Sequence, residues 1–204
     1  ENATALVLVP DNDKVGVGTG FFIAPNLMVT NRHVVENKQR VLLASSALKT
    51  VRRATVVHAT SNADIGSPDF ALLRLEDGTA PGLLDTTREI SKLAGVVAAG
   101  FPTVVVRSDE RFQRLVSGDL SAAPDLSLTQ GAVQSLQSGA GGMPLIVHTA
   151  AIAKGNSGGP LVDACGRLVG VNTFISVDQT QSARIQYAIR TQAMDAFLQG
   201  AGAQ

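Results

Sequence analysis

The sequence has a single cysteine, Cys165, among 204 residues, no tryptophan, and only 4% aromatic residues. One cysteine cannot form an intrachain disulfide, so the fold is not a disulfide scaffold and must hold by core packing. No run approaches the ~18 consecutive apolar residues that span a bilayer, so we expect no membrane segment. Lys+Arg and Asp+Glu both number 17, and this zero net charge excludes a globally basic nucleic-acid binder.

Metal and nucleotide chemistry are also poorly supported. The three histidines, His33, His58 and His148, are dispersed along the chain. Because a zinc site needs several such ligands held together, we expect no metal and no cofactor. The glycine-rich run at 16–20 lacks the βαβ context and long following helix of a dinucleotide site.

The apolar residues fall in many short runs separated by turn residues. Hydrophobic residues make up 45% of the chain, and a chain of this length can bury about 70% of its unfolded surface. Short β-rich runs bounded by Gly, Pro, Asn and Asp are typical of an all-β sandwich or barrel. The runs lie at 5–9, 15–23, 27–30, 41–44, 51–59, 70–75, 95–99, 103–106, 131–133, 145–148, 160–162, 168–173 and 185–189.

The clearest helical pattern lies near the C-terminus. Thr191 can cap a short helix in which Met194, Phe197 and Leu198 share one face, and Gly200 stands where such a helix stops. Residues 108–128 mix charges, Gly and Pro, and predict a long surface loop with a short strand near 112–116. A break near 86–93 divides the strands into two sets of similar size.

The strongest chemical signal is the run GNSGGP at 155–160. Acyl transfer needs a nucleophile with an exposed oxygen and backbone N–H donors aimed at the developing oxyanion. Glycines on both sides of Ser157 permit the tight backbone that this requires. A plain glycine-rich turn is the alternative interpretation of this segment.

His33 is the best candidate for the base that such a serine needs. Histidine titrates near neutrality, which suits proton transfer. His33 lies in the run TNRHVV at 30–35, where a helical turn is expected to follow an apolar strand. His58 and His148 lie inside β-like runs with no motif around them.

A base of this kind is oriented by a carboxylate that stays ionised beside it. Asp69 stands directly before the apolar strand at 70–75, which would fix it at the edge of a core. Asp64, in the turn-like run NADIG at 62–66, is the rival. We favour Asp69 over Asp64.

In combination and order, these segments resemble the trypsin-like (chymotrypsin-fold) serine peptidases. The pattern is most similar to the branch that includes the HtrA/Deg proteases and glutamyl endopeptidases. The matching motifs are GTGF at 18–21, TNRHVV at 30–35, DFALL at 69–73 and AAIAKGNSGGPL at 150–161. Arg32 departs from the pattern, since the family often has Ala or Gly there.

The resemblance covers about 16–189 and implies an all-β fold of two six-stranded antiparallel β-barrels with a short C-terminal helix. The N-terminal barrel, 1–90, would carry the His and Asp. The C-terminal barrel, 91–190, would carry the Ser, and 191–204 would form the helix and tail.

The same resemblance implies a serine endopeptidase that acts on protein or peptide substrates through an acyl-enzyme. Ser157 would attack the scissile carbonyl, His33 would move the proton, and Asp69 would hold the imidazole tautomer. The N–H groups of Gly155 and Ser157 would form the oxyanion hole.

The resemblance also implies which positions of this sequence would line a substrate pocket. No carboxylate lies where trypsin-like enzymes read Arg or Lys, and Asn172 stands near the place where glutamyl endopeptidases have a histidine. We therefore expect cleavage after small or medium aliphatic residues. The predicted substrate-binding residues are Ala151, Ile152, Lys154, Thr173, Phe174, Ile175 and Ile185.

Three further expectations concern the setting of the domain. Asn156 replaces the acid that pairs with a new N-terminus in animal zymogens, so we expect no activation by that ion pair. The sequence starts at Glu1, which suggests a processed chain, and family habit suggests an extracytoplasmic bacterial enzyme. Cys165 follows Ser157 by eight residues in a turn, and we expect no catalytic part for it.

Two other functions compete with this hypothesis. One is a catalytically inactive chymotrypsin-fold binding module. The presence of all three triad candidates argues against it. The other is an unrelated ester hydrolase, whose order along the chain would be Ser, Asp, His, the reverse of the order seen.

Overall fold

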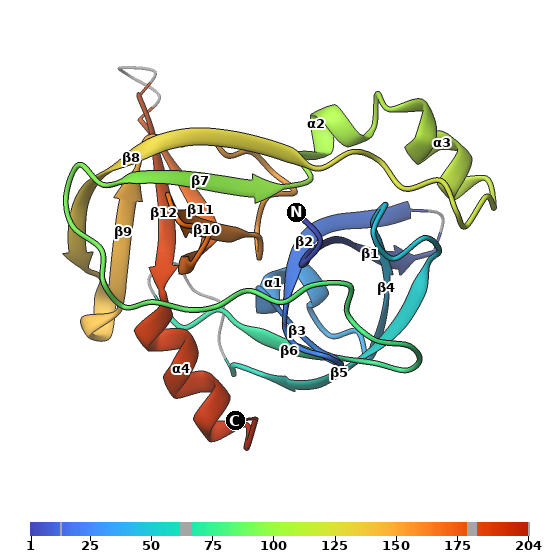
Figure 1. The fold of residues 1–204 in the computed structure, drawn as a ribbon, viewed down its shortest axis with the longest axis horizontal. Coiled ribbons are helices and arrows are strands. Elements are labelled where there is room, and N and C mark those ends of the chain that lie inside the picture. The colour runs from blue at the N-terminus through green and yellow to red at the C-terminus, as the bar shows by residue number, and fades with distance from the viewer. Residues whose placement is uncertain (13, 62–66, 179–182, 204) are drawn as a thin grey trace.

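The computed structural model describes residues 1–12, 14–61, 67–178 and 183–203, and its strands form two closed barrels (Figure 1). The strand order is β1-β2-β3-β6-β5-β4 in the first barrel and β10-β11-β12-β9-β8-β7 in the second. Neighbouring strands run antiparallel throughout. With a helix at the C-terminal end, this confirms the predicted fold class.

The elements have the following bounds. The first barrel contains β1 Thr4–Asp11, β2 Lys14–Ala24, β3 Leu27–Thr30, β4 Arg40–Ala44, β5 Arg52–Ala59 and β6 Ala71–Leu75. The second contains β7 Gly95–Gly100, β8 Ser127–Ser138, β9 Pro144–His148, β10 Pro160–Asp163, β11 Leu168–Asp178 and β12 Ala183–Arg190. The helices are α1 Arg32–Val35, α2 Thr103–Val106, α3 Glu110–Val116, the 3₁₀ turn Ala140–Gly142 and α4 Thr191–Gly200. The helical turn expected after Asn31 is α1.

Two sequence predictions between β7 and β8 are wrong. The β-branched run at 103–106 forms α2, not a strand, and the predicted loop strand at 112–116 falls in α3. The side chain of Asp109 caps α3 by accepting a hydrogen bond from the Arg111 N–H at 2.7 Å. The helices pack on the outside of the first barrel (Figure 1).

Strand β1 explains why this helical segment folds there. Side chains alternate across a strand, so Ala5, Val7 and Val9 enter the barrel core while Leu6 and Leu8 face outward. The outward pair is covered by Phe112 and Leu115, which are spaced i, i+3 on α3. Burial on β1 thus accounts for the position of α3, whereas in α2 only Val106 joins the same cluster and Val104 and Val105 are exposed.

The two barrels share a core beside α4. Phe21 and Phe70 of the first barrel belong to the same buried cluster as Val171 of the second barrel and Met194 and Phe197 of α4. The helix begins at Thr191, and its N-cap is Arg190 rather than the predicted Thr191. The Thr191 hydroxyl donates instead to the carbonyl of Thr87 at 2.8 Å, which ties the helix to the segment between the barrels.

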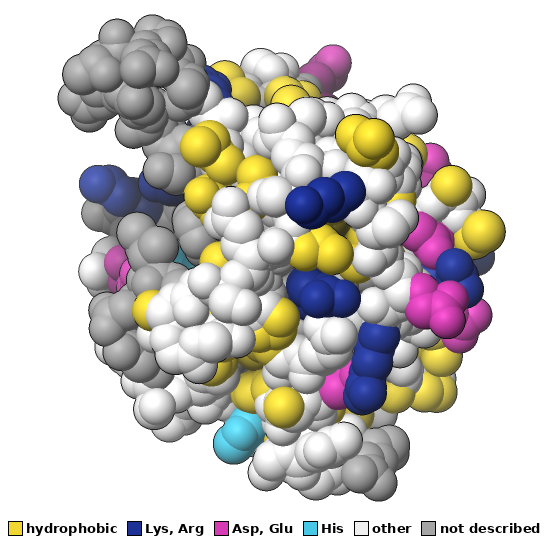
Figure 2. Space-filling model, turned by 90° about the vertical axis from the view of Figure 1, so that its left-hand side faces the viewer, with side chains coloured by type: hydrophobic (Ala, Val, Ile, Leu, Met, Phe, Trp, Pro, Cys, Tyr) yellow, Lys and Arg dark blue, Asp and Glu magenta, His cyan; other side chains and the backbone are white. Residues whose placement is uncertain are grey.

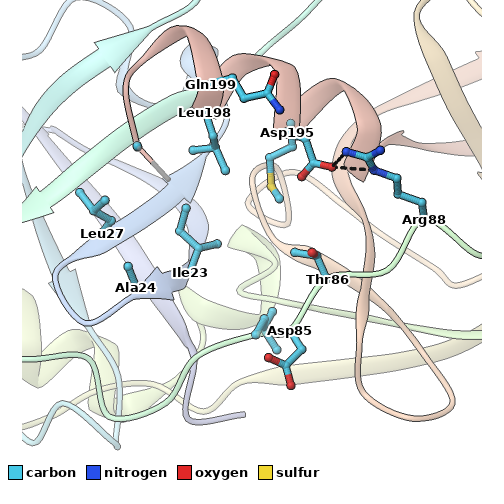
Figure 3. A pocket seen from close by; sticks show the side chains of 12 residues that line it. Ile23, Ala24, Leu27, Asp85, Thr86, Arg88, Asp195, Leu198 and Gln199 are labelled. Carbon is cyan, nitrogen blue, oxygen red and sulfur yellow. Dashed lines mark hydrogen bonds and ion pairs between the residues drawn. The ribbon is translucent and has the colours of Figure 1, made fainter.

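A cavity of about 390 Å³ lies between α4, the β2–β3 turn and residues 84–88 (Figure 3). Its wall mixes polar side chains with apolar ones such as Ile23, Leu27 and Leu198. At its edge Arg88 makes a double contact with Asp195 (2.6 and 2.9 Å). Neither His33, Asp69 nor Ser157 lines it.

Surface charges are mixed in the part of the molecule that Figure 2 shows. Lys and Arg side chains are spread among uncharged and apolar ones, and acidic side chains gather toward one edge. Within the described ranges, no helix is long and apolar enough to cross a membrane. The described residues also include no cluster of three or more His, Cys, Asp or Glu side chains suited to a metal ion.

Candidate active site

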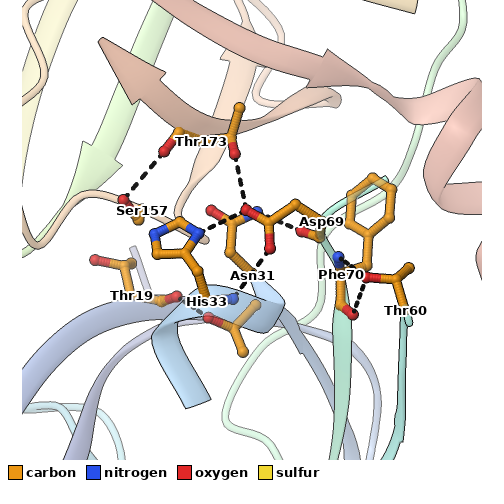
Figure 4. A network of polar contacts seen from close by, with 9 residues as sticks. Thr19, Asn31, His33, Thr60, Asp69, Phe70, Ser157 and Thr173 are labelled. Carbon is orange, nitrogen blue, oxygen red and sulfur yellow. Dashed lines mark hydrogen bonds and ion pairs between the residues drawn. The ribbon is translucent and has the colours of Figure 1, made fainter. Parts of the chain in front are cut away.

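The fold brings His33 and Asp69 together at one end of the first barrel (Figure 4). His33 is in α1, directly after β3, and Asp69 lies just before β6, which pairs with β3. The imidazole Nδ1 lies 2.6 Å from Oδ2 of Asp69, and the backbone N–H of His33 donates to Oδ1 at 3.0 Å. The imidazole is 41% exposed and the carboxylate 7% exposed, so the ring is open to solvent while the carboxylate is buried.

Besides His33, two other residues hold Asp69 in place. The Thr173 hydroxyl of the second barrel donates to Oδ2 at 3.1 Å. The side-chain amide of Asn31 donates to the Asp69 backbone carbonyl at 2.6 Å. The His33 backbone N–H and the Thr173 hydroxyl both donate to the carboxylate oxygens, and a carboxylate accepts hydrogen bonds. That in turn favours the tautomer of His33 with the proton on Nδ1 and a free Nε2.

Ser157 lies beside the imidazole of His33, which has Asp69 on its other side (Figure 4). Its hydroxyl donates to the Thr173 carbonyl at 3.2 Å. Catalytic hydrogen bonds are often unformed without substrate, and a rotation of the Ser157 side chain would redirect this hydroxyl toward Nε2. Thr173 thus contacts both the carboxylate and the serine.

The carbonyl groups of the loop 154–157 all point into the protein and accept hydrogen bonds. The Lys154 carbonyl accepts from the Thr103 N–H at 2.7 Å, and the Asn156 carbonyl from the Gly159 N–H at 2.9 Å. Thr19 supplies the other two bonds, from its hydroxyl to the Gly155 carbonyl at 2.7 Å and from its N–H to the Ser157 carbonyl at 3.0 Å.

The N–H groups of the same loop divide into two sets. Those of Asn156, Gly158 and Gly159 donate to backbone carbonyls. Within the described part of the chain, the N–H groups of Gly155 and Ser157 have no hydrogen-bond acceptor. A backbone with two neighbouring unused donors beside a serine hydroxyl can bind an anionic oxygen.

Two glycines in this loop are required by its geometry. Gly155 and Gly158 have φ of +101° and +83°, which side chains rarely tolerate. A Cβ on Gly155 would lie 2.3 Å from the Phe101 carbonyl oxygen, and one on Gly158 would lie 2.2 Å from the Thr30 hydroxyl. The glycine pattern in the sequence therefore reflects both the backbone conformation and close packing.

The predicted substrate-binding residues divide by exposure. Ala151, Lys154 and Ile185 are exposed, whereas Ile152 and Thr173 are buried. The backbone of Phe174 and Ile175 pairs with β12, but their side chains fall outside the description. The rival Asp64 also lies outside the described residues.

The residues that sequence reasoning set aside lie apart from this cluster. His58 is exposed and contacts Phe197, and His148 is fully buried in β9. Cys165 is an exposed free thiol. Asn156, in contrast, lies within the serine loop and is buried.

Thr19 and Asn31 are site-supporting residues that the sequence reasoning did not single out. They lie inside the matched motifs at 18–21 and 30–35, so the motifs could have pointed to them.

Comparison with known proteins gives the family. Residues 18–171 match the model of the trypsin-like peptidase domain, and the chain belongs to that family of serine peptidases. The curated relatives to which the chain is similar include HtrA proteases. The chain is 33% identical over 184 residues to the mitochondrial serine protease HTRA2 of Bos taurus, covering 89% of this chain and 35% of that protein. It is 30% identical over 164 residues to the serine protease Do-like HtrB of Bacillus subtilis (strain 168), covering 79% and 32%.

A solved HtrA-type protease, AlgW S227A with a tripeptide, has the same fold. It superimposes with a TM-score of 0.73 at 23% identity, over 97% of this chain and 59% of that one. The chain spans about a third of the length of the two curated relatives.

Proposed function

We propose that this chain is a serine endopeptidase domain that cleaves peptide bonds through an acyl-enzyme at Ser157. One observation carries the proposal. The imidazole of His33 lies between Asp69 and Ser157, beside a loop in which the N–H groups of Gly155 and Ser157 are unused. Family membership supports the same chemistry.

In the proposed reaction, Nε2 of His33 takes the Ser157 proton as the serine oxygen attacks the substrate carbonyl. The carbonyl oxygen becomes an oxyanion, which the N–H groups of Gly155 and Ser157 bind. His33 then gives its proton to the leaving amine, and a water molecule hydrolyses the acyl-enzyme by the same route in reverse. Asp69 stabilises the imidazolium in both steps without taking its proton.

The test is labelling with a fluorophosphonate probe together with turnover of a casein or peptide substrate. Wild type should be labelled and active, and Ser157→Ala should lose both. A matched control is Ser135→Ala in β8, which removes a hydroxyl away from the site and should change neither. Turnover that survives in purified Ser157→Ala would refute the assignment, and an unlabelled, inactive wild type would favour a binding module.

We further propose that cleavage follows small or medium aliphatic residues. The support is the absence of a carboxylate from the pocket wall at 151–154 and the apolar character of Ile152. Substrate profiling by mass spectrometry, with Ser157→Ala as the blank, tests this. A profile dominated by Arg, Lys or Glu at the cleaved position would contradict it.

The extracytoplasmic location stays a prediction based on family habit. Fractionation of the source cells with an antibody against this domain would test it, and recovery in the cytoplasmic fraction would contradict it.

A further inference from the structure

The hydroxyl of Thr19 makes an unusual connection between the barrels. Thr19 lies on β2 of the first barrel and is fully buried. Its hydroxyl donates to the Gly155 carbonyl at 2.7 Å and accepts from the Phe101 N–H at 3.0 Å. Both partners belong to the part of the chain that forms the second barrel and carries Ser157. Figure 4 shows Thr19 on the first-barrel side of the site, below Ser157.

Each polar atom of Thr19 has a partner. Besides the two hydroxyl bonds, its N–H donates to the Ser157 carbonyl at 3.0 Å, and its carbonyl accepts from the Thr30 hydroxyl at 2.6 Å. The Thr30 bond anchors Thr19 within its own barrel. The other three bonds reach across to the loop that carries the serine and to the end of β7.

These bonds determine where the unused N–H groups can point. A peptide group is planar, so fixing carbonyl oxygens on successive peptides restricts how the intervening N–H groups turn. Thr19 holds the carbonyls of Gly155 and Ser157. The peptide of the Gly155 carbonyl lies between the two peptides that carry the unused N–H groups of Gly155 and Ser157, so its orientation limits both. The Thr103 N–H holds the Lys154 carbonyl, on the same peptide as the Gly155 N–H.

Gly155 is also the residue most in need of such a restraint. Its φ of +101° lies where glycine is conformationally free. Without the Thr19 hydroxyl, the buried Gly155 carbonyl would lack its partner. Rotation of the loop to find another would carry the neighbouring donors with it.

We propose that Thr19 is a positioning residue for the oxyanion hole, acting through the Gly155 carbonyl. It makes the donor geometry depend on how the two barrels are docked. This inference rests on the proposed peptidase function. Thr19 touches no reacting atom, so its effect is on the rate of acylation rather than on substrate binding.

The test compares Thr19→Val with Thr19→Ser. Valine has nearly the same shape but no hydroxyl, whereas serine keeps it. Removing one oxyanion donor costs about 10²–10³ in rate. In Thr19→Val the donors are displaced but still present, so the loss should be smaller. We expect kcat to fall about 10- to 100-fold and KM to stay within about threefold of wild type. Thr19→Ser should recover most of the rate. Affinity for a peptide boronate, which forms a tetrahedral adduct with the serine, should fall in parallel with kcat/KM.

Thr191→Val is the matched control, since it deletes another buried threonine hydroxyl that donates to a backbone carbonyl, far from the site. It should lower the melting temperature but leave kcat unchanged. The proposal is overturned if Thr19→Val lowers kcat no more than Thr191→Val, if KM alone changes, or if Thr19→Ser fails to rescue.

Two further measurements separate this proposal from the peptidase assignment. Retained turnover in Ser157→Ala would refute the peptidase function, whereas loss there with full activity in Thr19→Val would refute only the positioning role. Crystal structures of wild type and Thr19→Val measure the loop directly. A Gly155 carbonyl displaced by about 1 Å or more supports the proposal, and an unmoved loop overturns it whatever the activity.

Discussion

Replacing Asp69 with Asn is the sharpest perturbation of the site, because it changes one atom and keeps the shape. Three donors face the two carboxylate oxygens of Asp69: the His33 N–H at Oδ1, and His33 Nδ1 and the Thr173 hydroxyl at Oδ2. An amide has one oxygen and one NH₂ group, so it cannot accept from all three.

The placement of the new NH₂ group follows from which partner can adapt. The backbone N–H of His33 can only donate, so the amide oxygen should stay at the Oδ1 position. The NH₂ group then faces Nδ1, which can become an acceptor if the imidazole proton moves to Nε2. That tautomer cannot accept the Ser157 proton, and the resulting loss is about 10⁴ in kcat, or about 5 kcal/mol.

The assay is steady-state turnover of a peptide substrate at pH 7, with melting temperature as the check on folding. Asp195→Asn is a suitable control, since it removes a carboxylate that binds Arg88 at the surface. It should leave kcat within about twofold, because exposed ion pairs contribute little. An Asp69→Asn enzyme that keeps more than a tenth of wild-type kcat would refute the tautomer argument.

Two further predictions concern stability. Gly158→Ala should destabilise by about 3 kcal/mol, from a positive φ and a Cβ 2.2 Å from the Thr30 hydroxyl. Gly166→Ala has a similar φ of +79° but open space around it, so urea unfolding should show a cost of only about 1 kcal/mol; equal costs would contradict the packing argument. Burial lowers the pKa of His148 to about 4 from its usual value of 6.5, although the Ala150 backbone and the Asn172 side chain partly oppose this shift. Because the unfolded chain binds the proton more tightly, stability should fall as the pH drops from 6.5 toward 4, by roughly 2–3 kcal/mol at pH 4.5. His148→Gln cannot ionise and should remove this part of the pH dependence, whereas an unchanged slope would exclude His148 as its source.

Much of the architecture could be predicted because strand signals are local. Alternating apolar runs bounded by turn residues place most barrel strands, and the GNSGGP run marks the loop whose glycines the structure requires at positive φ. The errors fall between 103 and 116, where β-branched residues favour strand locally. In the helices that form there, Val106, Phe112 and Leu115 cover the apolar surface that Leu6 and Leu8 present, a partner that no local pattern shows.

By itself, the sequence determined the kinds of chemical group present, their order along the chain, and the positions that only glycine can occupy. It also selected Asp69 over Asp64 from its place before a strand, and Asp69 contacts His33 in the structure. These are properties of single segments, which a linear pattern can carry. The His33–Asp69 contact, 36 residues apart, was decided by the pairing of β3 with β6 in the first barrel. The contacts of Thr173 with Asp69 and of Thr19 with Gly155, 104 and 136 residues apart, were decided only by the docking of the two barrels. Their physical reason is non-local, since a buried hydroxyl takes whichever polar partner the tertiary fold brings to it.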